Sequence, residues 1–509
     1  MLSVKALIII QSIAWVPRIW AQSTEDSIQP IKVGYFTDGG LRRDPFTAIA
    51  YDHCLILKQV GQTLVEIAAS GEIMPGIARK WTISLDRRNY TFFIDRSLRF
   101  HDGQSISAYD VEASLSQAAL TKDGPAQYYF HVVQGIDQGM GLRKILGFKA
   151  LDDERFQITL KRPFAPLLRA LTSGSMIILP RTGISRRTKV QELVGSGPYR
   201  ITGHRDHKLT LEPYPSYKGP YPPAATNLEI IEDTSLVTAR RIPQTHELPD
   251  YDHDVIGERL DLYQRLGYQF KQSPRLAVST FVPNAQIVSS ERLRRALFHL
   301  ILQATQGQKL NRPASVLRDI YPKGVLGYES QPQSFAKLTR EVSKTDIGLL
   351  HQSFKELRFG LPGSLLWDAD SLAKKMTKLS GLPVSWVPVD PNHLPHGIQA
   401  FPVHGVFFNW ANIFPDPESN IESIRMLGFM KLSKNRRQLS HLLKQASESA
   451  IDTERAFNYR LFRDLVYDEF LYLPLYQFER IEALKQGLSI NSSLYRQTPM
   501  LGELIRETP

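Results

Sequence analysis

Segments spaced like strands alternate with segments spaced like helices along the whole chain, and this limits the chain to folds in which helices pack on sheets. Residues 30–37 and 90–94 are rich in the β-branched and aromatic residues that strands favour. The strongest helix pattern begins near Ser290, and its apolar positions are Leu293, Ala296, Leu297, Leu300, Ile301 and Ala304. The sequence therefore predicts an α/β fold. Because 509 residues exceed what one hydrophobic core usually supports, we expect more than one lobe.

Three more helices are predicted from local patterns. Ser107 and Asp110 have the spacing of a capping box, which predicts that a helix begins there. Near the C-terminus, the apolar face of one helix is expected to consist of Leu439, Leu442, Leu443 and Ala446. The apolar face of the next helix is expected to consist of Phe457, Leu461 and Leu465.

Residues 1–21 have the layout of an export signal. Lys5 precedes an apolar run at 6–16 that is too short to span a bilayer, and Ala21 precedes a polar run. We expect cleavage after Ala21 and an exported, soluble protein, which in a bacterium with two membranes means the periplasm; the alternative is a buried N-terminal helix. The single cysteine, Cys54, lies far from the cleavage site, so we expect neither a lipid anchor nor an internal disulfide framework.

The charge of the chain excludes few functions. The formal net charge is +11, but the basic residues are dispersed, which favours a solvated basic surface and predicts no nucleic-acid partner. None of the 13 histidines stands in a recognisable Ser-His-Asp or metal-ligand spacing. We therefore expect no catalytic residue, no metal and no cofactor, and an exported hydrolase is the least favoured alternative.

The most specific motifs lie in widely separated segments. Residues 72–115 contain the runs EIMPGIA, YTF and FHDG, residues 195–199 read GSGPY, and Trp410 is followed by PDP at 415–417. Together with LRRAL at 293–297, these motifs resemble the family 5 extracellular solute-binding proteins, which are peptide, dipeptide and nickel receptors of ABC importers. The motifs follow the order of that family over most of the chain.

Two of these motifs invite a catalytic interpretation. His101 and Asp102 are adjacent, and Gly195-Ser196-Gly197 has the look of a phosphate loop or nucleophile elbow. However, Asp102-Gly103 suits a tight turn, and the glycine segment lacks the residues that either loop requires. We favour structural turns for both.

The resemblance implies a periplasmic binding protein-like fold, with two lobes joined by a hinge of crossing strands and an extra subdomain in the first lobe. A peptide-like or other small solute would be enclosed by hinge closure and delivered to the permease subunits of an ABC importer, and a monomer is expected. The expected segments are a signal peptide at 1–21, a discontinuous lobe I at 22–55, 185–270 and 470–509, its extra subdomain at 56–184, and lobe II at 271–469. The alternative is an exported ligand-sensing or partner-docking protein on the same fold, not linked to transport.

The candidate ligand-binding residues follow from the same resemblance. They are Trp410, Asn409, Asn284, Asn412, Asp416, Ile413, Tyr128 and Tyr129. For Trp410 the alternative is core packing, and for Asp416 it is a structural turn. Ile413 occupies the position where peptide receptors of the family have an aspartate that pairs with the ligand α-amino group. A buried ammonium facing Ile413 would be unpaired, so binding of a free peptide N-terminus in the usual mode is not expected.

Residues 245–254 are rich in acidic residues and contain two histidines. Such a composition allows a cation site, but Val255 stands where the EF-hand order needs glycine. We favour a solvated acidic loop.

Overall fold

The computed structural model describes most of the chain after the first 28 residues. The described residues are 29–35, 44–47, 51–121, 124–136, 145–184, 189–224, 226–232, 248–255, 258–310, 312–361, 368–389, 397–412, 414–426, 428, 430, 433–493, 495–496 and 498–507. The predicted export signal and its cleavage site lie outside them. Among the described helices, none is long and apolar enough to cross a membrane.

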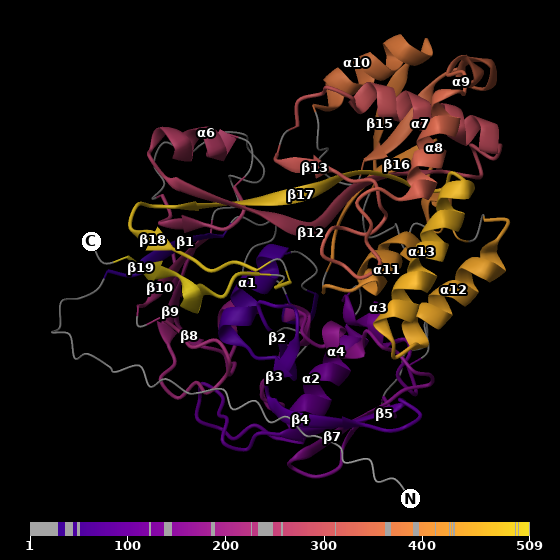
Figure 1. The fold of residues 1–509 in the computed structure, drawn as a ribbon. Helices are drawn as coiled ribbons and strands as arrows, with labels where there is room; N and C mark the ends of the chain where they lie inside the picture. Colours follow the sequence, from indigo (N-terminus) through magenta and orange to yellow (C-terminus); the bar gives the residue numbers. More distant parts are fainter. Residues whose placement is uncertain are drawn as a thin grey trace, which may run out of the picture.

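One large mixed sheet runs through the molecule in the order β15-β14-β16-β12-β17-β11-β1-β10-β9-β8, and β13 pairs with β17 (Figure 1). Its strands are β1 (Ile31–Tyr35), β8 (Tyr199–Arg205), β9 (Lys208–Pro213), β10 (Leu228–Glu232), β11 (Tyr251–Asp252), β12 (Gln269–Pro283), β13 (Ala314–Val316), β14 (Leu357–Leu361), β15 (Val384–Pro388), β16 (Gly405–Ala411) and β17 (Leu473–Leu484). The two long strands, β12 and β17, lie between the lower and upper parts of the molecule in Figure 1.

The pairing of β12 and β17 makes them the connection between the two parts. They are antiparallel from Gln269 opposite Leu484 to Phe281 opposite Leu473, with register shifts along the way. At one end β17 pairs with β11, and at the other end β12 pairs with β16. A strand pair that enters both parts is the hinge expected from the sequence.

The buried apolar residues form two main cores. The first takes residues from 31–251 and from 484–504, and we call the elements around it the first lobe. The second takes residues from 277–478, and we call the elements around it the second lobe. The α/β two-lobe architecture is therefore confirmed. Buried residues of the expected extra subdomain share the first core with part of the expected lobe I, whereas buried apolar residues within 470–478 of that lobe belong to the second core.

The first lobe adds a four-stranded sheet, β4-β5-β7-β6, to the large sheet. The remaining strands and helices of this lobe are β2 (Val65–Ile67), β3 (Ile73–Pro75), β4 (Ala78–Ile83), β5 (Asn89–Ile94), β6 (Phe148–Ala150), β7 (Arg155–Thr159), β18 (Leu488–Ser489), β19 (Ile505–Arg506), α1 (Tyr51–Val60), α2 (Ala108–Leu120), α3 (Ala126–Phe130) and α4 (Leu167–Ala170). The capping box before α2 is confirmed, because the Asp110 carboxylate accepts hydrogen bonds from the backbone N–H and the hydroxyl of Ser107 at 2.9 and 2.6 Å.

Helices cover the second lobe. They are α7 (Glu291–Thr305), α8 (Gln333–Ser343), α9 (Gly348–Ser353), α10 (Ala369–Ser380), α11 (Pro417–Met426), α12 (Arg436–Glu448) and α13 (Asp452–Asp468), while α6 (Glu258–Arg265) flanks β11. Short 3-10 helices are η2 (Pro45–Thr47), η3 (Gly174–Met176), η4 (Val190–Glu192), η6 (Ile398–Ala400) and η8 (Leu501–Glu503). The predicted α7 is confirmed with Ser290 as its N-cap, and the predicted apolar face of α12 is buried.

The predicted apolar face of α13 is wrong. Phe457 is 58% exposed and Leu461 is 37% exposed, whereas Tyr459 and Phe462 are fully buried. The helix is rotated because its inward face also carries arginines that form buried ion pairs; Arg455, for example, binds Asp416. The spacing of apolar residues alone does not predict which arginines of a helix are buried.

Candidate functional site

Trp410 lies in the second core. Its side chain is 9% exposed, its ring stacks on Phe408 with centroids 5.9 Å apart, and its indole Nε1 donates a hydrogen bond to the Ser419 carbonyl oxygen at 3.0 Å. Because the polar edge is satisfied internally and the ring is packed, the structure favours core packing over an aromatic ligand wall.

Two of the predicted asparagines have different surroundings. Asn284 is buried, and its Nδ2 donates to the Phe401 carbonyl oxygen at 3.2 Å while its Oδ1 accepts from the backbone N–H of Gln286 at 3.2 Å. It therefore fixes the turn after β12. Asn409 is exposed on β16 opposite Ser279.

Asn412 is the predicted residue with unused hydrogen-bonding capacity. It is 5% exposed, and its backbone N–H donates to the Leu276 carbonyl oxygen at 2.6 Å. Neither polar atom of its side-chain amide has a hydrogen-bond partner within the described residues. A buried amide left unpaired costs about 1–3 kcal/mol, so a partner supplied from outside the chain would relieve it.

Tyr129 brings the first lobe against the segment after β16. Its ring is 1% exposed and meets the Phe414 ring edge to face with centroids 4.7 Å apart. Tyr129, Ala170 and Phe414 form a small buried cluster between the lobes. Tyr128 lies in α3, but its side chain is outside the described residues, and so is Ile413.

Asp416 is engaged in a buried ion pair. Both of its carboxylate oxygens accept hydrogen bonds from Arg455 Nη2, at 2.9 and 2.8 Å, and both side chains are 1% exposed. Burial opposes the charge of Arg455, but Asp416 outweighs this effect and holds the Arg455 pKa above its usual value. The first-lobe Arg169 also approaches, with Nη1 3.7 Å from Asp416 Oδ2.

A cavity of about 20 Å³ lies where the two lobes meet, with room for one or two water molecules. The second lobe contributes Phe414 and Pro415 to its wall. The first lobe contributes Lys58, Glu66, Ile67, Thr172, Tyr221, Tyr495, Arg496, Thr498 and Met500. The predicted motif around residue 414 therefore borders an interlobe cavity, although its Trp410 does not line it.

Two buried cations line this cavity, each with its own acid. Lys58 forms an ion pair with Glu66. Arg496 donates two hydrogen bonds to the Glu503 carboxylate, at 2.7 and 3.1 Å, and its guanidinium lies 4.8 Å from the centroid of the Tyr221 ring. Lys58 and Arg496 were not predicted from the sequence, because they come from segments far apart in the chain and belong to no recognised motif.

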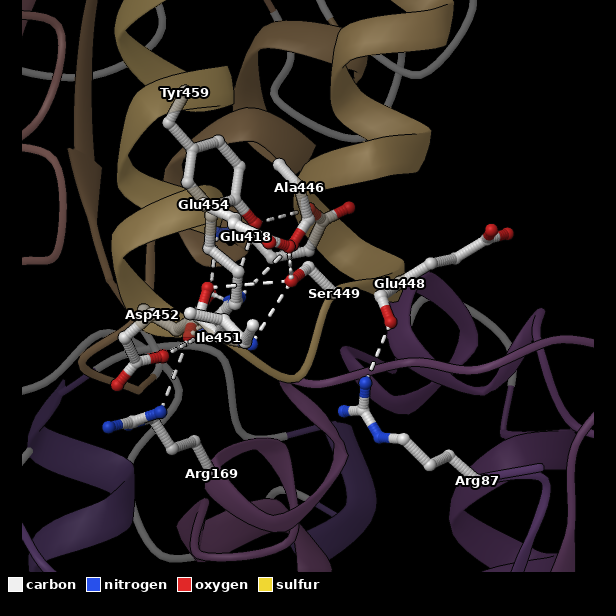
Figure 2. A network of polar contacts seen from close by, with 12 residues as sticks. Arg87, Arg169, Glu418, Ala446, Glu448, Ser449, Ile451, Asp452, Glu454 and Tyr459 are labelled. Carbon is white, nitrogen blue, oxygen red and sulfur yellow. Dashed lines mark hydrogen bonds and ion pairs between the residues drawn. The ribbon is translucent and has the colours of Figure 1, made fainter. Parts of the chain in front are cut away.

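The lobes are also in contact at the C-terminal end of α12. Arg87 donates to the Glu448 carbonyl oxygen at 2.8 Å, Arg162 donates to Ser447 Oγ at 3.0 Å, and the backbone N–H of Ala165 donates to the Ser447 carbonyl oxygen at 2.7 Å. Figure 2 shows Arg87 reaching from the first lobe toward Glu448 at the end of α12. We call these contacts of Arg87, Arg162 and Ala165 with Ser447 and Glu448 the α12 seam. These contacts hold the two lobes together.

Both motifs with a possible catalytic interpretation have structural partners. His101, Asp102 and Gly103 form the expected turn, in which the Gly103 N–H donates to the Phe100 carbonyl oxygen at 2.9 Å. The turn expected at 195–197 is wrong: this segment packs against the end of α1, where the Gly197 N–H donates to the Val60 carbonyl oxygen at 2.7 Å. The described partners place the proton of His101 on Nε2, which donates to the Gly197 carbonyl oxygen at 3.0 Å, while Nδ1 accepts from the Gly195 N–H at 3.4 Å. Burial lowers the His101 pKa to about 4, which keeps the ring neutral. A Cβ at Gly195 would lie 1.9 Å from the Val60 carbonyl oxygen, so glycine is required there for close backbone packing.

The prediction of a solvated acidic loop is wrong for residues 250–254. Asp252 is fully buried and pairs with Arg259 at 2.7 Å, and Asp254 lies between Arg275 and Arg312 at 2.6 and 2.9 Å. Burial opposes the charge of Asp254, but Arg275 and Arg312 hold its pKa below the usual value. The arginine partners lie up to 58 residues away, so local composition did not reveal them. Among the described residues, no group of three or more His, Cys, Asp and Glu side chains is placed to hold a metal ion.

The chain matches one family model and is similar in sequence to several known proteins. The family model "Bacterial extracellular solute-binding proteins, family 5 Middle" matches residues 72–346. The dipeptide-binding protein of Escherichia coli strain K12 is 24% identical over 282 residues, which cover 52% of each chain. The periplasmic murein peptide-binding protein of the same strain is 23% identical over 330 residues, covering 61% of this chain and 60% of that one. The chain thus matches about half of the length of these curated relatives.

Solved structures match over more of the chain. The murein tripeptide-binding protein of Escherichia coli has a TM-score of 0.72 at 17% identity, covering 94% of this chain and 99% of that one. A dipeptide-binding protein from a Pseudoalteromonas species, in complex with Met-Leu, has a TM-score of 0.70 at 17% identity, covering 94% and 100%. At this identity the likeness shows the fold, which is that of the periplasmic peptide-binding proteins.

Proposed function

This chain belongs to the bacterial extracellular solute-binding proteins, family 5, and we propose that it is a receptor that encloses a small solute between its lobes and delivers it to the permease subunits of an ABC importer. The observation that carries this proposal is the interlobe cavity. Its wall joins polar groups of the first lobe to Phe414 and Pro415 of the second. The crossing strands β12 and β17 supply the hinge about which the lobes would open.

The proposed solute is peptide-like or another small molecule of that size. The relatives are named for dipeptides and murein peptides, and one structural neighbour is described in complex with agropinic acid. With the lobes in contact, the cavity holds only water-sized groups. A solute would therefore enter as the lobes separate, and it would hold them further apart than they are here.

The remaining features of the proposal follow the sequence-based expectations. We propose an exported, periplasmic protein without a lipid anchor, which acts as a monomer and has no catalytic activity. The described residues of the cavity wall include no histidine, cysteine or serine, so a Ser-His or Cys-His pair is absent among them. The division into a signal at 1–21, lobe I, its extra subdomain and lobe II is proposed with the boundaries given above.

Native mass spectrometry of the protein purified from a bacterial periplasm tests this function. We expect a 1:1 complex with a small solute, which denaturation releases for identification. The dipeptide-binding protein of Escherichia coli, purified in the same way, is the control. If the control carries its ligand and this chain is found only without one, the proposed function is wrong.

A further inference from the structure

Three acids among the described residues lie in the wall of the interlobe cavity or beside it, and each is paired with a cation of the chain. Glu66 accepts hydrogen bonds from Lys58 Nζ and, at 3.0 and 2.7 Å, from the backbone N–H and the hydroxyl of Thr63. Glu503 is bound by Arg496. Asp416, next to the wall residue Pro415, is bound by Arg455. No carboxylate among these three is left uncompensated to receive a cationic ligand.

The unsatisfied polar atom in the cavity wall is a donor. Arg496 is 5% exposed, and both of its terminal nitrogens are bound to Glu503. Its Nε–H has no hydrogen-bond partner within the described residues. Among the buried side-chain atoms without a partner, Arg496 Nε is the one that belongs to a residue of the cavity wall. A ligand atom that satisfies it must be an acceptor.

A third cation lies close by with spare donors. The Arg169 guanidinium is 31% exposed, and its described contact is the ion pair with Asp416 at 3.7 Å, beyond hydrogen-bond distance. Arg169 lies in α4, three residues before Thr172, which lines the cavity, and it adjoins Ala170, which packs on Phe414. Arg455 is already paired with Asp416 and, at 3.3 Å, with Asp452, so the donors of Arg169 remain available to an acceptor of the solute.

We propose that the solute presents a carboxylate or another acceptor oxygen to Arg496 and carries no ammonium group at that end. This inference rests on the proposed function and specifies the class of solute: acidic or N-acylated molecules rather than solutes held by a free amine. An ammonium buried in this cavity would find no unpaired acid, and its desolvation would not be recovered. An acceptor oxygen would instead satisfy the buried Arg496 Nε–H, forming a charge-assisted hydrogen bond.

Two probes that exchange the charged end test this inference. N-acetyl-Ala-Ala has a carboxylate and no ammonium, and Ala-Ala-amide has an ammonium and no carboxylate. Isothermal titration calorimetry of the full mature chain is expected to show N-acetyl-Ala-Ala binding at least about tenfold more tightly. Equal or tighter binding of Ala-Ala-amide would overturn the inference while leaving the proposed function intact. If neither probe binds, the proposed peptide-like solute fails, and this inference fails with it.

Substitutions of Arg496 separate its role in binding from its role in folding. Arg496→Gln is expected to weaken binding of N-acetyl-Ala-Ala about tenfold and to improve binding of Ala-Ala-amide, because Glu503 is then unpaired. The double variant Arg496→Gln/Glu503→Gln removes both charges, and it should lose affinity for N-acetyl-Ala-Ala without gaining affinity for Ala-Ala-amide. If Arg496→Gln alone does not fold, this double variant tests the role of Arg496 in its place. Arg200→Gln, which breaks a pair with Glu212 at the surface, is the matched control. Unchanged affinity for N-acetyl-Ala-Ala in both Arg496 variants would refute the assignment.

Discussion

The α12 seam predicts how strongly the lobes hold together without a solute. The helix α12 has no basic residue of its own in its last turn, so Arg87 and Arg162 of the first lobe supply the positive charge that its C-terminal carbonyls favour. Replacing both by glutamine removes the charge, and the shorter side chains no longer reach Ser447 and Glu448. We expect this double variant to shift the equilibrium toward the open form.

The size of the shift follows from the contacts. Arg87 makes one hydrogen bond to a carbonyl at 2.8 Å, and Arg162 makes one to Ser447 Oγ at 3.0 Å with the Glu448 carboxylate at 3.5 Å. Arg162 and Glu448 are 29% and 25% exposed, so solvent screens their pair. At about 1 kcal/mol for each arginine, the double variant loses about 2 kcal/mol of interlobe attraction. This corresponds to about a 30-fold change in the ratio of closed to open molecules.

Fluorescence energy transfer between the lobes measures this ratio. The native Cys54 is fully buried, so dyes attached to cysteines introduced at exposed Leu146 and Phe457 would report on the first and second lobes. The double variant should show a larger population with a long distance between dyes. The control is Arg155→Gln, which breaks an exposed pair with Asp152 in the first lobe. Identical distance distributions in the wild type, the double variant and the control would refute the role of the seam.

Three further predictions test local assignments. Asp416→Asn should lower the free energy of unfolding of the second lobe by about 3–5 kcal/mol in denaturant titrations, because the buried Arg455 then keeps only Asp452, which is 60% exposed, as an acidic partner; an effect below about 1 kcal/mol would show that the pair is not structural. Phe457→Ser should change the free energy of unfolding by less than about 0.5 kcal/mol, because Phe457 is exposed. Phe462→Ala should lower it by about 3–5 kcal/mol, because Phe462 is fully buried. Equal effects of the two substitutions would contradict the buried face of α13. Burial lowers the pKa of His101 from 6.5 to about 4, so the unfolded chain takes up a proton on His101 at a higher pH than the folded chain does. The free energy of unfolding should therefore fall as the pH drops from 6.5 toward 4, by up to about 1.4 kcal/mol per pH unit. If His101→Gln shows the same dependence of stability on pH as the wild type, another group causes it.

The fold was largely predictable because its signals are local. The capping box at Ser107 and the helix after Ser290 each depend on residues that are neighbours in sequence, and the structure has both. The face of α13 was not predictable from apolar spacing, because Arg455 turns inward to reach Asp416, 39 residues earlier. Long-range charge pairs leave no periodic pattern in the sequence.

The candidate site was predictable only in part. The segment from Trp410 to Asp416 does reach the boundary between the lobes, but Phe414 is the member that borders the cavity together with Pro415. The polar groups opposite, Lys58 and Arg496, are 438 positions apart in sequence (496 − 58 = 438) and meet only after the chain returns to the first lobe. A single sequence gives no means of pairing them. Asn412 remains a candidate from the sequence, with an amide that is buried and unpaired among the described residues.

The central claim is that this chain closes on a solute held between its lobes. The most direct measurement is the distance between dyes at positions 146 and 457, recorded before and after adding the solute released from the purified protein. The account predicts that the solute converts the population of open molecules into one distribution with a shorter distance, with a midpoint at the solute concentration that half-saturates binding. Binding of the solute with no change in the distance distribution would contradict it.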